Sequence, residues 1–197
     1  MTPSLLLALA TFSFIGSVTP GPNNIMLMAS GAAFGFRRTL PHMAGIALGF
    51  GVMILLVGLG LAGLLDRWPA LATGLKAASV AYMLWFAWKI LNAGAPGEAE
   101  GRARPLTLMQ AALFQWVNPK AWALALTMVA AYAPTHTPAS VAMVAGVAAL
   151  TTIPAVVIWP LVGQGIRRFL ADDRRRRLFN AAMAACLLAS LWPVLVH

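Results

Sequence analysis

Charged residues are scarce in this sequence, and acidic residues are the scarcest of them. Charged residues make up 10% of the 197 residues, and only five are Asp or Glu. A soluble domain has about 25% charged residues. Hydrophobic residues reach 60%. This balance excludes an ordinary soluble domain and predicts an integral membrane protein with little mass outside the bilayer.

Cysteine is almost absent as well. The single cysteine, Cys186, excludes disulfide staples, a paired-cysteine redox relay and a thiolate metal cluster. His42, His136 and His197 lie far apart, and no acidic residues cluster with them. We therefore expect no metal site, no cofactor and no catalytic residue, and we predict that the chain is not an enzyme.

Long apolar runs fill most of the chain. A helix needs about 20 apolar residues to cross a bilayer, so this length allows six spans and predicts an all-α membrane protein. The first and fourth runs contain helix breakers near their middle, the fifth contains Pro154 and Pro160 as expected kinks, and short polar stretches separate all six. The predicted spans are Leu5–Phe34, Thr39–Leu65, Ala70–Leu91, Thr107–Tyr132, Ala139–Val162 and Leu178–Val196.

The net charge of +9 is explained by membrane topology and not by nucleic-acid binding. With six spans, 11 of the 14 Lys and Arg residues lie in or next to the loops on one side of the membrane, and only Arg67 lies on the other side. The positive-inside rule places the basic loops in the cytoplasm and both termini in the periplasm. The cytoplasmic set is Arg37, Arg38, Lys89, Arg102, Arg104, Arg167, Arg168 and Arg174 to Arg177.

Two spans contain helix breakers near their middle. The first reads "SVTPGPNNIM" and the fourth "FQWVNPKAW". Proline removes a backbone donor and clashes with the preceding turn. The backbone groups freed in this way are tolerated at membrane depth only where they are packed in protein or line a wet cavity. The breaks therefore predict a cavity.

The two breaks also predict an internal repeat. Asn23 and Asn118 lie 95 positions apart, close to half the chain. Each half then has three spans, and an odd number of spans inverts the second half. Interrupted spans at matching positions in inverted halves point to a transporter binding site. We predict one transporter domain over residues 1–197, with repeats at about 1–92 and 106–197 and a cytoplasmic linker at 93–105.

Lys120 is the only ionisable residue predicted near the bilayer centre, because all five acids lie in loops. Carbonyls freed by the breaks could satisfy its ammonium, or a substrate carboxylate could. The asparagines could cap the broken ends or hold a polar ligand, and a half-helix that starts near Asn23 suits a carboxylate. The candidate substrate-binding residues are Pro20, Gly21, Pro22, Asn23, Asn24, Gln115, Asn118, Pro119 and Lys120.

The motifs "TPGPNN", "GFRR", "YMLWFAWKI" and "NPK", in this order over essentially the whole chain, resemble the lysine and homoserine/threonine exporter family (LysE/RhtB). The resemblance implies six spans and efflux of small amino acids across the bacterial inner membrane, driven by an ion or proton gradient. The opening "MTPSLL", together with "TPGPNNI", "GFR" and "AYMLWFAWKI", looks most like the branch that exports cysteine and O-acetylserine. Several family members carry an acid in a later span, whereas "ALTTIPAVVIW" here has none.

Three functions remain open at this point. A secondary exporter would bind an amino acid and couple to a cation, with H⁺ expected, carried by Lys120 or by the substrate amine. A passive channel for small polar solutes is the alternative, since paired broken helices also build pores. A membrane enzyme or redox relay lacks the residues for its chemistry. The expected partners are the substrate and membrane lipid, with a homodimer possible and no nucleic acid.

Overall fold

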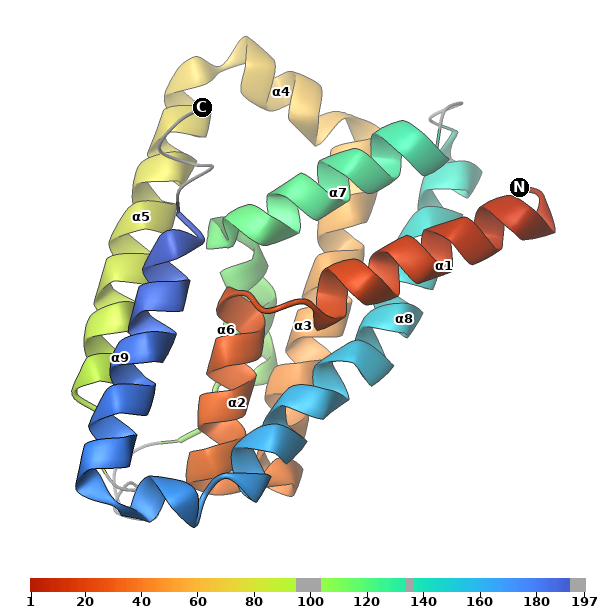
Figure 1. Ribbon diagram of the computed structural model, residues 1–197. Coiled ribbons are helices and arrows are strands. Elements are labelled where there is room, and N and C mark those ends of the chain that lie inside the picture. The colour runs from red at the N-terminus through yellow and green to blue at the C-terminus, as the bar shows by residue number, and fades with distance from the viewer. Residues whose placement is uncertain (95–103, 134–136, 192–197) are drawn as a thin grey trace.

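The protein is described here by a computed structural model that covers residues 1–94, 104–133 and 137–191. Helices account for nearly all of the described residues, and no strand occurs among them. Figure 1 shows long helices that run between the two ends of the molecule, with α1 and α7 lying oblique to most of them. The predicted all-α class is therefore confirmed.

The first half of the chain folds into three long helical units: α1 with α2, α3 with η1 and α4, and α5. A bent pair of helices comes first, a long helix with a kink follows, and a straight helix closes this half. The elements are α1 (Pro3–Val18), α2 (Pro22–Phe34), α3 (Phe36–Leu56), η1 (Val57–Leu61), α4 (Ala62–Arg67) and α5 (Pro69–Leu91).

The second half begins with another broken helix and continues with the longest helix of the chain. The elements are α6 (Leu108–Phe114), η3 (Gln115–Val117), α7 (Pro119–Tyr132), α8 (Pro138–Gly165), η4 (Phe169–Ala171) and α9 (Asp173–Ala189). Residues 95–103 of the predicted linker and residues 192–196 of the predicted last span lie outside the described residues.

Three helical stretches are long and apolar enough to cross a membrane: Phe36–Arg67, Pro69–Leu91 and Pro138–Gly165. A fourth is added if α1 and α2, bent by 57° at their break, form one span. These stretches agree with a multi-pass membrane protein. The full set of six spans stays a prediction.

The second predicted span is less regular than its sequence suggested. Between α3 and α4 the helix widens into the π-helical segment η1, and Gly60 adopts a φ of 116° within it. Glycine tolerates this conformation because it has no Cβ. The uninterrupted apolar run gave no sign of the kink, which is why the span was predicted as one continuous helix.

Helix α8 lies at the centre of the packing and contacts α1, α2 and α3, while α5 pairs with α9 (Figure 1). Glycines allow the closest approaches. A Cβ added at Gly31 would overlap the backbone of Pro160, and one added at Gly163 would overlap the carbonyl oxygen of Met28. Backbone therefore meets backbone between α2 and α8, as is common where small residues face each other in membranes.

This contact predicts the outcome of two matched substitutions on α8. Gly163→Ala should destabilise the protein by about 1–3 kcal/mol, because a methyl group added to a closed contact forces the backbones apart. Gly146→Ala is the control, since nothing lies within 4 Å of a Cβ added there. Thermal unfolding of the purified protein in detergent measures both. Equal melting temperatures for the two variants would contradict the packing described.

Candidate functional site

The first break separates α1 from α2 in an extended stretch. Thr19 and Gly21 both have extended backbone angles, and Pro22 begins α2 at a position where its missing N–H costs nothing. Asn24 Nδ2 donates to the carbonyl oxygens of Ser17, at 2.8 Å, and of Thr19, at 2.7 Å. The side chain of Asn24 therefore caps the broken end of α1 from inside α2.

The second break has related chemistry. The chain leaves η3 at Asn118, which is extended and buried, and Pro119 begins α7. Asn118 Oδ1 accepts a hydrogen bond from the backbone N–H of Lys120 at 3.2 Å. Asn118 therefore caps α7. Of the three asparagines, Asn24 and Asn118 serve the capping role that the sequence left open.

Lys120 joins the two breaks. Its ammonium donates to the carbonyl oxygen of Thr19, to Thr19 Oγ1 at 2.8 Å and to the carbonyl oxygen of Pro20 at 3.3 Å. Carbonyls freed by the first break thus satisfy the lysine of the second, which was one of the two possibilities. Gly21 makes room for this contact, because a Cβ there would lie 2.8 Å from Lys120 Cδ.

Asn23 and Gln115 form a second link between the breaks. Asn23 Nδ2 donates to Gln115 Oε1 at 2.9 Å, and Gln115 Nε2 donates back to Asn23 Oδ1 at 3.3 Å. Gln115 Nε2 also donates to the carbonyl oxygen of Ala111 at 2.9 Å. Gln115 is fully buried. Among the candidate residues, Gln115 was the one that the sequence supported least. In the structure, its side chain is the hydrogen-bond partner of the Asn23 side chain.

A narrow, half-open cavity lies where the two breaks meet. It encloses about 370 Å³ of space between atoms, part of it open to the outside. The six predicted site residues that line it are Gly21, Asn23, Asn24, Gln115, Asn118 and Lys120. The other three, Pro20, Pro22 and Pro119, shape the breaks and are not part of the lining.

Several lining residues were not predicted from the sequence. The hydroxyl groups of Ser17, on α1, and Thr152, on α8, lie 3.1 Å apart at the cavity wall. Apolar side chains from α3 and α8 complete the wall, among them Ile46, Phe50 and Val156. The two adjacent threonines in the otherwise apolar "ALTTIPAVVIW" were the feature of the sequence from which Thr152 could have been predicted to line the cavity.

The cavity has one charged group and many uncharged polar ones. Lys120 is cationic, and no acidic side chain occurs among the described residues that line the cavity. Amides and hydroxyls both donate and accept hydrogen bonds. No side chain caps the start of α2, so its positive dipole end is open at Gly21. This set of groups suits a small zwitterion.

A double-mutant cycle tests the contact between Gly21 and Lys120. Gly21→Ala should push the lysine away from Thr19 and Pro20 and lower stability by about 1 kcal/mol. In a Lys120→Ala background the same change should have little effect, because the colliding atoms are gone. Thermal unfolding of the four proteins gives the coupling. An equal loss in both backgrounds would show that Lys120 does not occupy this position.

Comparison with known proteins gives consistent matches. The family model described as LysE type translocator matches residues 14–191. The cysteine/O-acetylserine efflux protein of Escherichia coli strain K12 is 34% identical over 194 residues, which cover 95% of this chain and 96% of that protein. Proteins of the same name from Shigella sonnei strain Ss046 and Escherichia coli O1:K1 are 34% and 33% identical over the same shares. No solved structure gives a significant match.

Proposed function

The chain belongs to the LysE type translocator family, as its motifs predict, and we propose that it exports small amino acids or their derivatives across the bacterial inner membrane. The relatives named as cysteine/O-acetylserine efflux proteins support substrates of this class. One structural observation carries the proposal: both helix breaks meet at one polar cavity, joined through Lys120.

The substrate carboxylate would bind between Lys120 and the open start of α2. Both carry positive charge, and they approach each other at Gly21. The substrate amine would meet oxygens of the amides and of Ser17 and Thr152. Its short side chain would lie against Ile46 and Phe50. Substrates of the homoserine, threonine, cysteine or O-acetylserine type are proposed from the family and from the names of the relatives.

The contacts between helices support two inverted repeats. In this arrangement α1–α2 corresponds to α6–α7, α3 to α8, and α5 to α9. The contact of α1 with α8 then corresponds to the contact of α6 with α3, while the α3–α8 and α5–α9 contacts map onto themselves. All four contacts occur. Rocking of one repeat against the other around the cavity would alternate access.

We expect the proton motive force to drive export. No carboxylate lines the described part of the cavity, so a proton would travel on Lys120 or on the substrate amine. A carboxylate that binds Lys120 competes with the Thr19 and Pro20 carbonyls. Substrate would therefore loosen the link between the two breaks and favour the rearrangement that moves it outward.

The proposed orientation predicts a labelling pattern. Asp66 lies in α4 and Ala171 in η4, and both are exposed. In Figure 1, α4 lies at the top of the molecule, and the turn between α8 and α9 that contains η4 lies at the bottom. In a Cys186→Ser background, a membrane-impermeant maleimide should label Asp66→Cys in intact cells. It should label Ala171→Cys only after permeabilisation. The reverse pattern would place the basic loops in the periplasm and contradict the orientation.

Efflux tests the function directly. Cells that express the chain should release a few small amino acids after loading with a mixed dipeptide pool, and an uncoupler should abolish the release. Lys120→Ala should lower the rate at least about tenfold, because charged hydrogen bonds contribute about 1.5–3 kcal/mol. Asn23→Ala should act in the same direction.

Lys76→Ala is the matched control, since Lys76 lies on α5 and does not line the cavity. Its efflux should equal that of the unmodified chain when the two are expressed equally. Normal export by Lys120→Ala would remove the lysine from the mechanism. Flux that only follows the concentration difference, insensitive to the uncoupler, would favour a passive channel.

A further inference from the structure

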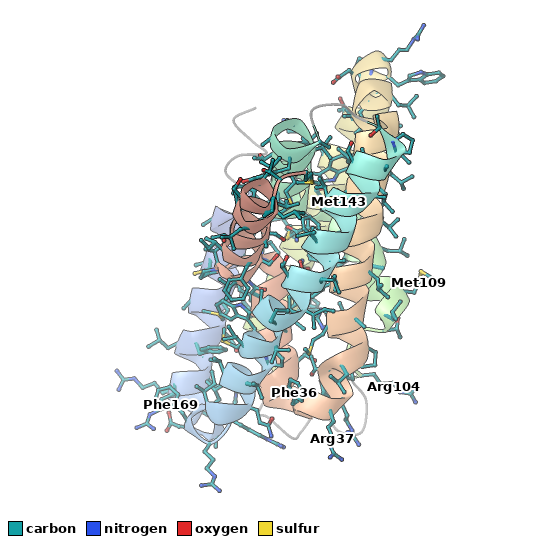
Figure 2. The ribbon with its side chains drawn as sticks, turned by 90° about the vertical axis from the view of Figure 1, so that its right-hand side faces the viewer. Phe36, Arg37, Arg104, Met109, Met143 and Phe169 are labelled. Carbon is teal, nitrogen blue, oxygen red and sulfur yellow. The ribbon has the colours of Figure 1, made fainter. Side chains whose placement is uncertain are left out.

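A second hollow lies away from the cavity, at the end of the molecule that carries the basic turns. The turn between α2 and α3 forms one side of it, and the stretch that leads into α6 forms the other. It has a volume of about 1,030 Å³, open space included. Figure 2 shows Arg37 and Arg104 at this end of the molecule, far from Met143. None of the proposed substrate-binding residues lines this hollow.

Three arginines converge on the hollow from distant parts of the sequence. Arg37 and Arg38 lie in the first turn of α3, and Arg104 precedes α6. Among the described residues, none forms an ion pair or hydrogen bond with these three side chains. No acidic residue occurs in the described lining. Arg176, by contrast, pairs with Asp173 at 2.8 Å. The described part of the hollow therefore presents three guanidinium groups and no carboxylate.

Apolar surface continues from the hollow toward the middle of the molecule. The lining itself includes Phe34 and Leu106. Beyond it, large apolar side chains are exposed along both helices, Leu48 and Val52 on α3, and Met109 on α6. Figure 2 shows Met109 pointing outward above Arg104. A ligand with an anionic end and long apolar chains matches both parts of this surface.

We infer that this hollow binds an anionic phospholipid. The phosphate lies among Arg37, Arg38 and Arg104, and the acyl chains extend over the apolar side chains of α3 and α6. Guanidinium groups bind phosphate in a bidentate manner, and basic pockets between helices at the cytoplasmic side bind anionic headgroups. A free phosphate ion would account for the three arginines but not for the adjoining apolar surface. The inference depends on membrane embedding and does not require the chain to be an exporter.

Native mass spectrometry of the purified full chain provides the test. Dioleoyl phosphatidylglycerol should be retained in preference to dioleoyl phosphatidylcholine. Arg104→Gln should weaken phosphatidylglycerol binding about fivefold, and the triple change Arg37→Gln, Arg38→Gln and Arg104→Gln on the order of a hundredfold. Thermal unfolding without added lipid shows whether each variant is folded, and Arg104→Lys, which keeps the charge, should bind within a few-fold of the unmodified chain.

The matched control removes the same charge from the same end of the molecule but outside the hollow, through Arg174→Gln, Arg175→Gln and Arg177→Gln. Phosphatidylglycerol binding should persist in this control. An equal loss in both triple variants would mean that lipids respond only to overall charge and would overturn the site. Displacement of the lipid by millimolar inorganic phosphate or glycerol 3-phosphate would indicate a free-anion site and would overturn it as well.

Discussion

The hydrogen bonds from the Lys120 ammonium to the backbone oxygens of Thr19 and Pro20 solve two problems at once. A helix broken inside a membrane exposes carbonyl groups, and each costs several kcal/mol if left unpaired. A lysine at the same depth with no carboxylate nearby is also costly. Either feature alone would destabilise the fold. Together they satisfy each other, so the two breaks depend on being side by side.

This dependence determines much of the surrounding structure. Gly21 must be small because the lysine side chain passes over it. The two parts of the first broken helix are held differently. α2 approaches α8 closely enough for backbone to touch backbone at Gly163, whereas α1 meets α8 through hydroxyl pairs such as Ser17 with Thr152.

Sequence reasoning located the breaks because proline, glycine and asparagine affect the backbone locally. The caps made by Asn24 and Asn118 follow from the same local chemistry. What sequence could not provide was the partner of each side chain. That Gln115 pairs with Asn23, or that Thr152 reaches the cavity, depends on how helices distant in sequence pack. The kink at Gly60 was missed for a similar reason, since a glycine in an apolar run predicts helix packing as readily as a bend.

The scarcity of acidic residues, the first feature of the sequence, also bears on how the proposed exporter would work. A carboxylate fixed beside Lys120 would hold the ammonium permanently and leave nothing for a substrate. Here its partners are backbone carbonyls and the Thr19 hydroxyl, which carry only partial charge, so a substrate carboxylate would compete with them effectively. In the proposed exporter, an empty cavity would keep the two breaks joined and an occupied one would separate them. In this view the missing acid is what allows the substrate to control the transition.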